Sequence, residues 1–262
     1  MPELPDLEVL KENIWRHFGG QTVSDVYARQ ERGRLVSKLK NQKLAGITRR
    51  GKFLIFAFGQ NEADLKAELV LHLMLNGRLS VEAAGRARPG TVLLALEFDR
   101  AEELRLTDQT FWAKYWLGAN GHLDKLGLEP LSDDFTEDWF AKRVQKSRGR
   151  IKPLLMKQEF IAGLGNAYTD EALFAARIDP AREAKKLGAD EIAELHQAIK
   201  KVIPWGIAQV KKSVGAAIKE DEKRVFMKVY RRAGQPCPRC GNIIKETKLQ
   251  GRDTFYCGKC QQ

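Results

Sequence analysis

The spacing of apolar residues changes along the chain and predicts three successive kinds of structure. Between residues 5 and 18 an apolar residue recurs every three or four positions, at Leu7, Leu10, Ile14 and Phe18. This spacing predicts an amphipathic helix. From about residue 20 to 116 the apolar runs are short or alternating, which predicts strands, and glycine, asparagine and charged residues separate them. The runs are Phe53–Phe58, Leu69–Leu75, Val92–Phe98 and Leu104–Thr107. Successive short strands without long helices favour an antiparallel sandwich or barrel.

A linker precedes the second, helical half of the chain. Residues 127–134 read Gly-Leu-Glu-Pro-Leu-Ser-Asp-Asp, and Asp134 followed by Glu137 predicts a helix start. Helical spacing then recurs near residues 135–146, 150–157, 167–176 and 190–212. The last of these has one continuous apolar stripe, and we expect a kink at Pro204.

Charge narrows the choice of partner. The 262 residues include 45 Lys and Arg against 34 Asp and Glu, so the net charge is +11 and a polyanion is the first partner to consider. A hydrophobic content of 43% excludes a disordered chain. No apolar run is long enough to span a bilayer, and no secretory signal opens the chain. We therefore expect a cytoplasmic, nucleoid-associated protein.

The four cysteines lie in the most basic part of the chain. They are Cys237, Cys240, Cys257 and Cys260. Their spacing, C-x2-C-x16-C-x2-C, is typical of a zinc ribbon or finger. Four thiolates would close the coordination sphere of one structural zinc ion. Disulfides or free thiols are the alternatives, and a cytosolic setting argues against disulfides. The last 40 residues carry ten Lys and Arg against two acids, which is either a solvated face or a surface for phosphate.

A glycine-rich junction is a second candidate for phosphate binding. Residues 163–168 read Gly-Leu-Gly-Asn-Ala-Tyr, and the predicted helix after them starts near Asn166. Free N–H groups at a helix N-terminus can bind a DNA phosphate without reading the base sequence. The same pattern is also common in ordinary turns.

Six blocks together resemble the formamidopyrimidine-DNA glycosylase / endonuclease VIII family. The first reads Met-Pro-Glu-Leu-Pro-Asp-Leu-Glu, and the blocks follow the family's order across nearly the whole chain: Met1–Glu8, Arg49–Leu54, His72–Gly77, Gly127–Phe135, Gly163–Phe174 and Gly251–Cys260. The resemblance implies an α+β multidomain fold with a β-sandwich and leading helix over 1–118. A helix–two-turn–helix domain over 130–222 and a zinc-finger hairpin over 226–262 would follow. It also implies a monomer that acts on damaged double-stranded DNA.

The resemblance further implies a bifunctional DNA glycosylase/AP lyase. Once Met1 is removed, the secondary amine of Pro2 would attack C1′ of the damaged nucleotide. Glu3 would transfer protons at the sugar ring oxygen. Lys52 matches the family's lysine that contacts phosphate near the lesion, and Asn166 and Arg252 match two further phosphate contacts. Without the other blocks, Pro2 and Glu3 would be ordinary residues at a helix start.

The chain departs from the better-known family pattern at several positions. Residues 108–113 read Asp-Gln-Thr-Phe-Trp-Ala, where many members read Asp-Pro-Arg-Arg-Phe-Gly. The arginine and phenylalanine that usually fill the gap left by an everted base are therefore altered. Phe111 or Trp112 either stacks into that gap or belongs to the core. Leu75 occupies the methionine wedge position, and Asp6 replaces a glutamate. The segment Ala216–Val229 is short for a lid over oxidised purine, so we expect weak activity on 8-oxoguanine.

Two other functions remain as alternatives from the sequence. A homologue that binds damaged or abasic DNA without excising the base would share these blocks. A zinc-ribbon protein that binds RNA or the ribosome would explain the charge and the cysteines, but not Pro2, Glu3 or Lys52.

Overall fold

The computed structural model describes residues 1–61, 63–119, 121–219 and 224–262. The chain divides into two compact units, Met1–Asp124 with Val210–Asp221, and Lys125–Gln209 with Glu222–Gln262. The first unit contains two four-stranded sheets, and the second is mainly helical. Within the described residues, no helix combines the length and the apolar character needed to cross a membrane.

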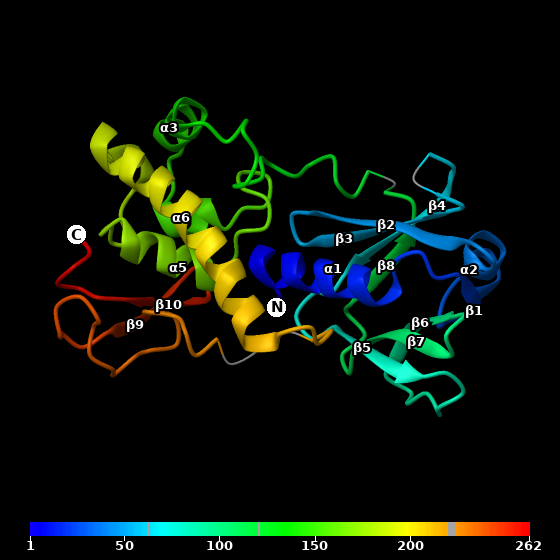
Figure 1. Ribbon diagram of the computed structural model, residues 1–262. Helices are drawn as coiled ribbons and strands as arrows, with labels where there is room; N and C mark the ends of the chain where they lie inside the picture. The colour runs from blue at the N-terminus through cyan, green and yellow to red at the C-terminus, as the bar shows by residue number, and fades with distance from the viewer. Residues whose placement is uncertain (62, 120, 220–223) are drawn as a thin grey trace. The chain divides into compact units, whose positions relative to one another are not determined.

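The predicted sandwich is confirmed in the first unit, where two antiparallel sheets lie in layers (Figure 1). One sheet has the strand order β1 (Val23–Ala28), β6 (Val92–Phe98), β7 (Glu102–Thr107) and β5 (Arg78–Ala83). The other has the order β2 (Lys43–Arg50), β3 (Phe53–Gly59), β4 (Leu65–His72) and β8 (Lys114–Leu117). Neighbouring strands pair antiparallel in both sheets.

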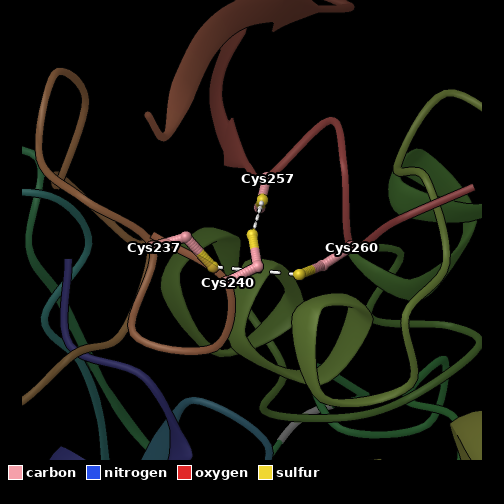
Figure 2. Close-up of side chains that lie close together, drawn as sticks. All are labelled: Cys237, Cys240, Cys257 and Cys260. Atoms are coloured by element: carbon pink, nitrogen blue, oxygen red, sulfur yellow. Dashed lines mark hydrogen bonds between the residues drawn. The ribbon is translucent and has the colours of Figure 1, made fainter. Parts of the chain in front are cut away.

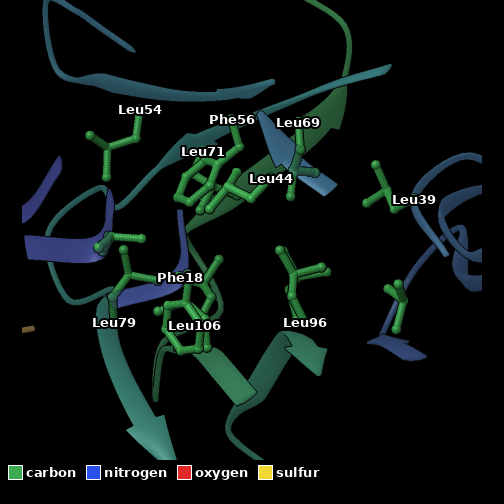
Figure 3. Close-up of a cluster of buried hydrophobic side chains, with 14 of the residues drawn as sticks. Phe18, Leu39, Leu44, Leu54, Phe56, Leu69, Leu71, Leu79, Leu96 and Leu106 are labelled. Atoms are coloured by element: carbon green, nitrogen blue, oxygen red, sulfur yellow. The ribbon is translucent and has the colours of Figure 1, made fainter. Parts of the chain in front are cut away.

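One apolar core fills the space between these sheets. Alternate residues of β3 are fully buried, as expected for a strand with one face on a core. Figure 3 shows leucine and phenylalanine side chains of the two sheets converging, among them Leu54, Phe56, Leu71, Leu79, Leu96 and Leu106. Helix α1 (Leu4–Phe18) adds its predicted apolar stripe, and the Phe18 ring stacks on Phe98 at 4.4 Å. Each such side chain contributes about 1.5–3 kcal/mol on burial.

A helix interrupts the region predicted to contain only strands. Helix α2 (Arg32–Leu39) packs against β1 and β4 and buries just two side chains, Leu35 and Leu39. One pair of apolar residues four positions apart is too little to reveal a helical period in sequence. The prediction for residues 20–116 was therefore wrong at this segment.

The second unit contains the predicted helices and a hairpin. Its elements are α3 (Glu137–Lys146), α4 (Ile151–Leu155), α5 (Asn166–Ala175), the 3₁₀ helix η1 (Ala184–Lys186), most of α6 (Ala189–Val214), β9 (Lys245–Leu249) and β10 (Arg252–Tyr256). The predicted start at Asp134 was wrong by two residues, because Thr136 caps α3 by accepting a hydrogen bond from Trp139 N–H at 3.2 Å. Helix α6 continues through Pro204 for a further ten residues.

Candidate active site and zinc centre

The N-terminal residues are fixed by the first turn of α1. Glu3 is the N-cap of this helix and forms a capping box with Asp6, in which Glu3 N–H donates to Asp6 Oδ2 at 2.8 Å. Pro5 suits the same turn, because the N–H it lacks would have no partner within the helix. Pro2 and Glu3 are both buried. Asp6, one of the departures from the family pattern, therefore helps to hold the backbone of Glu3.

Lys52 lies in the tight turn between β2 and β3. Arg50 pairs with Phe53, so Gly51 and Lys52 form a two-residue hairpin loop, and Gly51 takes the positive φ of 57° that such loops favour. Arg49 joins this turn to α1, because its Nε donates to Glu8 Oε2 at 2.8 Å and its Nη1 donates to the Gly51 carbonyl at 2.9 Å. Only 6% of Lys52 is exposed, which is rare for a lysine.

His72, at the end of β4, opens one of the six blocks, but the sequence pattern indicates no role for it. It pairs with Phe53, the residue after Lys52. Burial, and then the nearby charge of Lys52, lower the pKa of His72 to about 4. Its Nδ1 accepts a hydrogen bond from Met74 N–H at 3.0 Å, as a neutral ring nitrogen does. A neutral imidazole therefore lies close to the Lys52 cation, and its perturbed pKa marks it as a functional-site candidate.

We expect His72 to make the first unit sensitive to acid. Its pKa is about 4 in the folded chain and 6.5 ordinarily, so the unfolded chain binds the proton first. The neutral His72 ring therefore contributes up to about 3 kcal/mol to the free energy of unfolding. This contribution is complete above pH 6.5 and is lost as the pH falls through 4. Urea titrations between pH 7 and pH 4 should show a smaller loss of unfolding free energy for His72→Gln than for the unchanged protein. An equal loss in both would contradict this assignment.

The two candidate wedge segments lie side by side in the first unit. Asp108 organises the second, because its carboxylate accepts hydrogen bonds from three backbone N–H groups and from the Thr110 hydroxyl. Burial raises the pKa of Asp108, but these hydrogen bonds outweigh it and the pKa lies below its ordinary value. Asn76 Nδ2 donates to Thr110 Oγ1 at 3.3 Å and links the two segments. Leu75 is 48% exposed and Phe111 is 42% exposed, so Phe111 is not a core residue.

The glycine-rich junction places Asn166 against the hairpin of the second unit. Gly163 has φ 89°, a conformation that favours glycine, and Gly165 is the N-cap of α5. Asn166 is the first residue of α5, and its Nδ2 donates to the Asp253 carbonyl at 2.9 Å. Asp253 follows Arg252 directly. The structure thus brings together Asn166 and Arg252, two residues that are 86 positions apart in sequence.

A buried ion pair anchors the same hairpin. Lys152 Nζ on α4 lies 2.7 Å from Asp170 Oδ1 on α5, and it donates to the Asp253 carbonyl and to Thr254 Oγ1 at 2.9 and 2.8 Å. Phe255 N–H donates to Asp170 Oδ2 at 3.0 Å. Burial raises the pKa of Asp170 to about 7, against the opposing effects of Lys152 and this N–H. Removing one partner of such a buried pair typically costs about 3–5 kcal/mol, so these contacts hold β10 firmly beside Asn166.

The four cysteines of the C-terminal segment converge in the second unit (Figure 2). Their Sγ atoms all lie within 4.8 Å of one another, with Cys237 and Cys260 at 3.9 Å and Cys240 and Cys257 at 3.5 Å. These distances exclude disulfide bonds, which require about 2.05 Å. A tetrahedral zinc ion with bonds of about 2.3 Å would separate its sulfurs by about 3.8 Å. The donor set therefore fits one structural zinc ion.

The hairpin between the cysteine pairs presents Arg252 at its tip. Strands β9 and β10 are joined by Gln250 and Gly251, whose φ angles of 48° and 75° are both positive, as a type I′ turn requires. Arg252 follows this turn and is exposed. The predicted hairpin is confirmed. Asn166 and Arg252 lie in the second unit, whereas Pro2, Glu3, Lys52, Leu75 and Phe111 lie in the first.

Comparison with known proteins agrees with this arrangement along the whole chain. Residues 1–113 match the formamidopyrimidine-DNA glycosylase N-terminal domain, residues 126–217 match its H2TH domain, and residues 234–262 match a zinc finger found in FPG and IleRS. The formamidopyrimidine-DNA glycosylase of Pelotomaculum thermopropionicum is 33% identical over 280 residues, covering 100% of this chain and 99% of the relative. The chain belongs to the formamidopyrimidine-DNA glycosylase family. The cysteine cluster is thus its structural zinc site.

Solved structures of family members carry the same fold. Lactococcus lactis Fpg in complex with abasic-site DNA is similar with a TM-score of 0.87 at 29% identity, covering 99% of each chain. MutM in complex with DNA containing carbocyclic 8-oxo-G is similar with a TM-score of 0.88 at 30% identity, covering 100% of each chain. The predicted α+β architecture, with its sandwich, helix–two-turn–helix region and zinc-finger hairpin, is confirmed by these similarities.

Proposed function

We propose that this chain is a bifunctional DNA glycosylase/AP lyase that acts on damaged double-stranded DNA. The observation that carries the proposal is the full-length family match of a chain whose Pro2 and Glu3 are held at the start of α1. The relatives' structures contain abasic and oxidised DNA, which supports a DNA substrate for this chain as well. We assign catalysis to residues 1–118, and DNA binding to residues 130–222 and the zinc finger 226–262.

The first chemical step in this proposal uses the amine of Pro2. With Met1 removed, an N-terminal amine has a pKa near about 8 and is partly neutral at working pH. Its nitrogen forms a bond to C1′ as the glycosidic bond breaks, and the damaged base leaves with the bonding electron pair and takes up the proton that the Pro2 nitrogen loses. Glu3, the neighbouring carboxyl, donates a proton to the sugar ring oxygen as the ring opens. The product is an iminium between Pro2 and C1′.

Strand cleavage then follows by elimination. The iminium makes the C2′ proton acidic, and removal of that proton expels the 3′ phosphate with the electrons of its C–O bond. Zinc has no part in this step, since four thiolates leave it no open coordination position. Reduction with borohydride in the presence of abasic DNA should therefore give a covalent protein–DNA adduct. A homologue that binds abasic DNA without forming a Schiff base would give none.

Phosphate contacts in this proposal come from both units. Lys52 binds phosphate near the lesion, and Asn166 and Arg252 bind phosphates at the hairpin, where their relative position is set by the Asp253 carbonyl. Leu75 and Phe111 are exposed apolar side chains suited to filling the space that an everted base leaves.

Arg252→Ala should weaken binding to every lesion to a similar degree. Phosphate contacts carry no base information, and three to five of them imply a log–log salt slope of roughly −3 to −5. The variant should reduce that slope by about 1. Fluorescence titrations at several salt concentrations, with abasic and base-damaged duplexes, measure both effects. Arg86→Ala, which removes an exposed arginine paired with Glu82, is the matched control. An effect confined to one lesion would contradict the assignment.

Weak excision of 8-oxoguanine is also part of this proposal. It depends on the altered loop at 108–113 and on the short segment Ala216–Val229, of which residues 220–223 lie outside the described part of the chain. Fewer hydrogen bonds to a flipped purine should lower its rate of release. The measurement is excision of 8-oxoguanine opposite cytosine beside strand cutting at an abasic site in the same duplex. Equal rates would refute the expectation.

A further inference from the structure

A basic cavity lies on the first unit between α2 and β4. Its volume is about 410 Å³, and its lining includes Arg34, Lys38, Lys66, Glu68, Leu65 and Leu117. None of the residues assigned above to catalysis or DNA binding lines it. The cavity is therefore a separate feature that the proposed glycosylase activity does not explain.

The lining combines positive charge with exposed apolar surface. Three cations face one carboxylate, so the net charge of the lining is 3 − 1 = +2. Arg34 pairs with Glu31 at 3.4 Å and Lys66 pairs with Asp64, but all four side chains are largely exposed. Exposed ion pairs of this kind are worth little, so both cations can exchange their partners for acidic groups of a ligand. Leu65, in the lining of the cavity, is 45% exposed.

The first residues of β4 have no strand beside them on the cavity side within residues 1–61, 63–119 and 121–219 of the described chain. Strand β8 pairs with β4 only over Leu69–His72, and the ladder ends where Gly118 N–H donates to the Glu68 carbonyl at 2.8 Å. The start of β4 continues past that point. Among the residues that the structure describes, no strand pairs with Leu65–Ala67 on this side. Such an edge can accept an extended peptide as an added strand.

We propose that this cavity binds an acidic, extended segment of a partner protein. The segment adds as a strand beside Leu65–Ala67, its carboxylates meet Arg34, Lys38 and Lys66, and an apolar side chain packs on Leu65 and Leu117. A second copy of this chain is disfavoured, because pairing two such edges would bring their Lys66 residues together. A nucleic acid fits less well, because the backbone N–H and C=O groups of a strand edge have no complementary row of donors and acceptors in a phosphodiester chain.

The test uses the full chain and an end-blocked ten-residue peptide that alternates glutamate with valine. Fluorescence anisotropy of the labelled peptide should show saturable binding, and replacing its glutamates by lysine should abolish it. Lys38→Glu and Lys66→Glu should each weaken binding at least about tenfold, as expected when a charge pair becomes repulsive. Lys142→Glu, an exposed lysine of α3 with a carboxylate partner, should leave binding unchanged. All three variants should keep borohydride trapping on abasic DNA, which separates this site from the proposed active site.

Hydrogen exchange locates the bound peptide. On binding, the amides of Leu65–Ala67 should exchange more slowly, and a peptide with alternate amides N-methylated should bind at least about tenfold more weakly. Three results would overturn the proposal. They are the absence of saturable binding, equal binding by the Lys38→Glu and Lys66→Glu variants, and displacement of the peptide by a single-stranded oligonucleotide whose own binding depends on Lys38 and Lys66.

Discussion

A form of the protein whose N-terminal amine is blocked should lose strand cleavage at abasic sites by at least about a thousandfold, the scale of removing a covalent nucleophile. Retained Met1 or an N-terminal tag turns the Pro2 nitrogen into an amide, which has no lone pair available for attack on C1′. The phosphate contacts proposed for Lys52, Asn166 and Arg252 would be untouched, so affinity for the same duplex should change little. Cleavage and binding are compared between the blocked form and protein that begins at Pro2.

Glu3→Gln provides the control for this experiment. The variant keeps the amine of Pro2, and Glu3 N–H can still donate to Asp6 at the start of α1. It should bind damaged DNA normally and remove the base slowly, because a proton donor is lost while the shape is kept. Trapping on abasic DNA should persist, since no base has to leave. Cleavage by the blocked form at an undiminished rate would refute the role of Pro2.

Cys257→Ser should release the zinc ion and most of the DNA affinity while the sandwich stays folded. Structural zinc contributes on the order of 10 kcal/mol to the folding of such modules, and Cys257 is a fully buried member of the cluster. Without the metal, the hairpin should unfold and Arg252 should leave its place beside Asn166, because the Lys152–Asp170 ion pair, at about 3–5 kcal/mol, does not offset the loss of the zinc contribution. The core of the sandwich shares no residue with the small apolar cluster around the cysteines, so it should survive.

Metal analysis and duplex binding measure the effect of this change, and hydrogen exchange reports whether the sandwich persists. Lys259→Ser is the matched control, because Lys259 is exposed between Cys257 and Cys260 and supplies no thiolate. That variant should keep one zinc ion per chain. Purified, active protein without zinc would contradict the account, as would a Cys257→Ser protein that binds DNA normally.

Features set by local chemistry could be predicted from the sequence. The apolar stripe of α1 depends on side-chain period and β6 depends on a short apolar run, and both lie where the pattern indicates. The zinc site follows from cysteine spacing, because each C-x2-C brings two thiolates to one turn. Asn166 lies at a helix start because the two glycines before it permit the turn.

Features set by contacts between distant residues could not be predicted in this way. The ion pair between Lys152 and Asp170, and its bonds to the hairpin, join segments up to 102 positions apart. Nothing in the local pattern around Lys152 indicates that its charge is buried. The neutral state of His72 likewise depends on its burial and on Lys52, which only strand pairing brings near. The four-residue strand β8 is too short to have a recognisable period.

The most direct test of the central claim is to identify the residue that borohydride joins to abasic DNA. Lys52 is the main rival of Pro2, since it is also an amine and is assigned to the phosphate next to the lesion. The adduct is digested with protease and nuclease, and the modified peptide is sequenced by mass spectrometry. The account predicts a single adduct on the N-terminal peptide that begins at Pro2. An adduct on Lys52, or trapping that persists when the N-terminus is blocked, would contradict it.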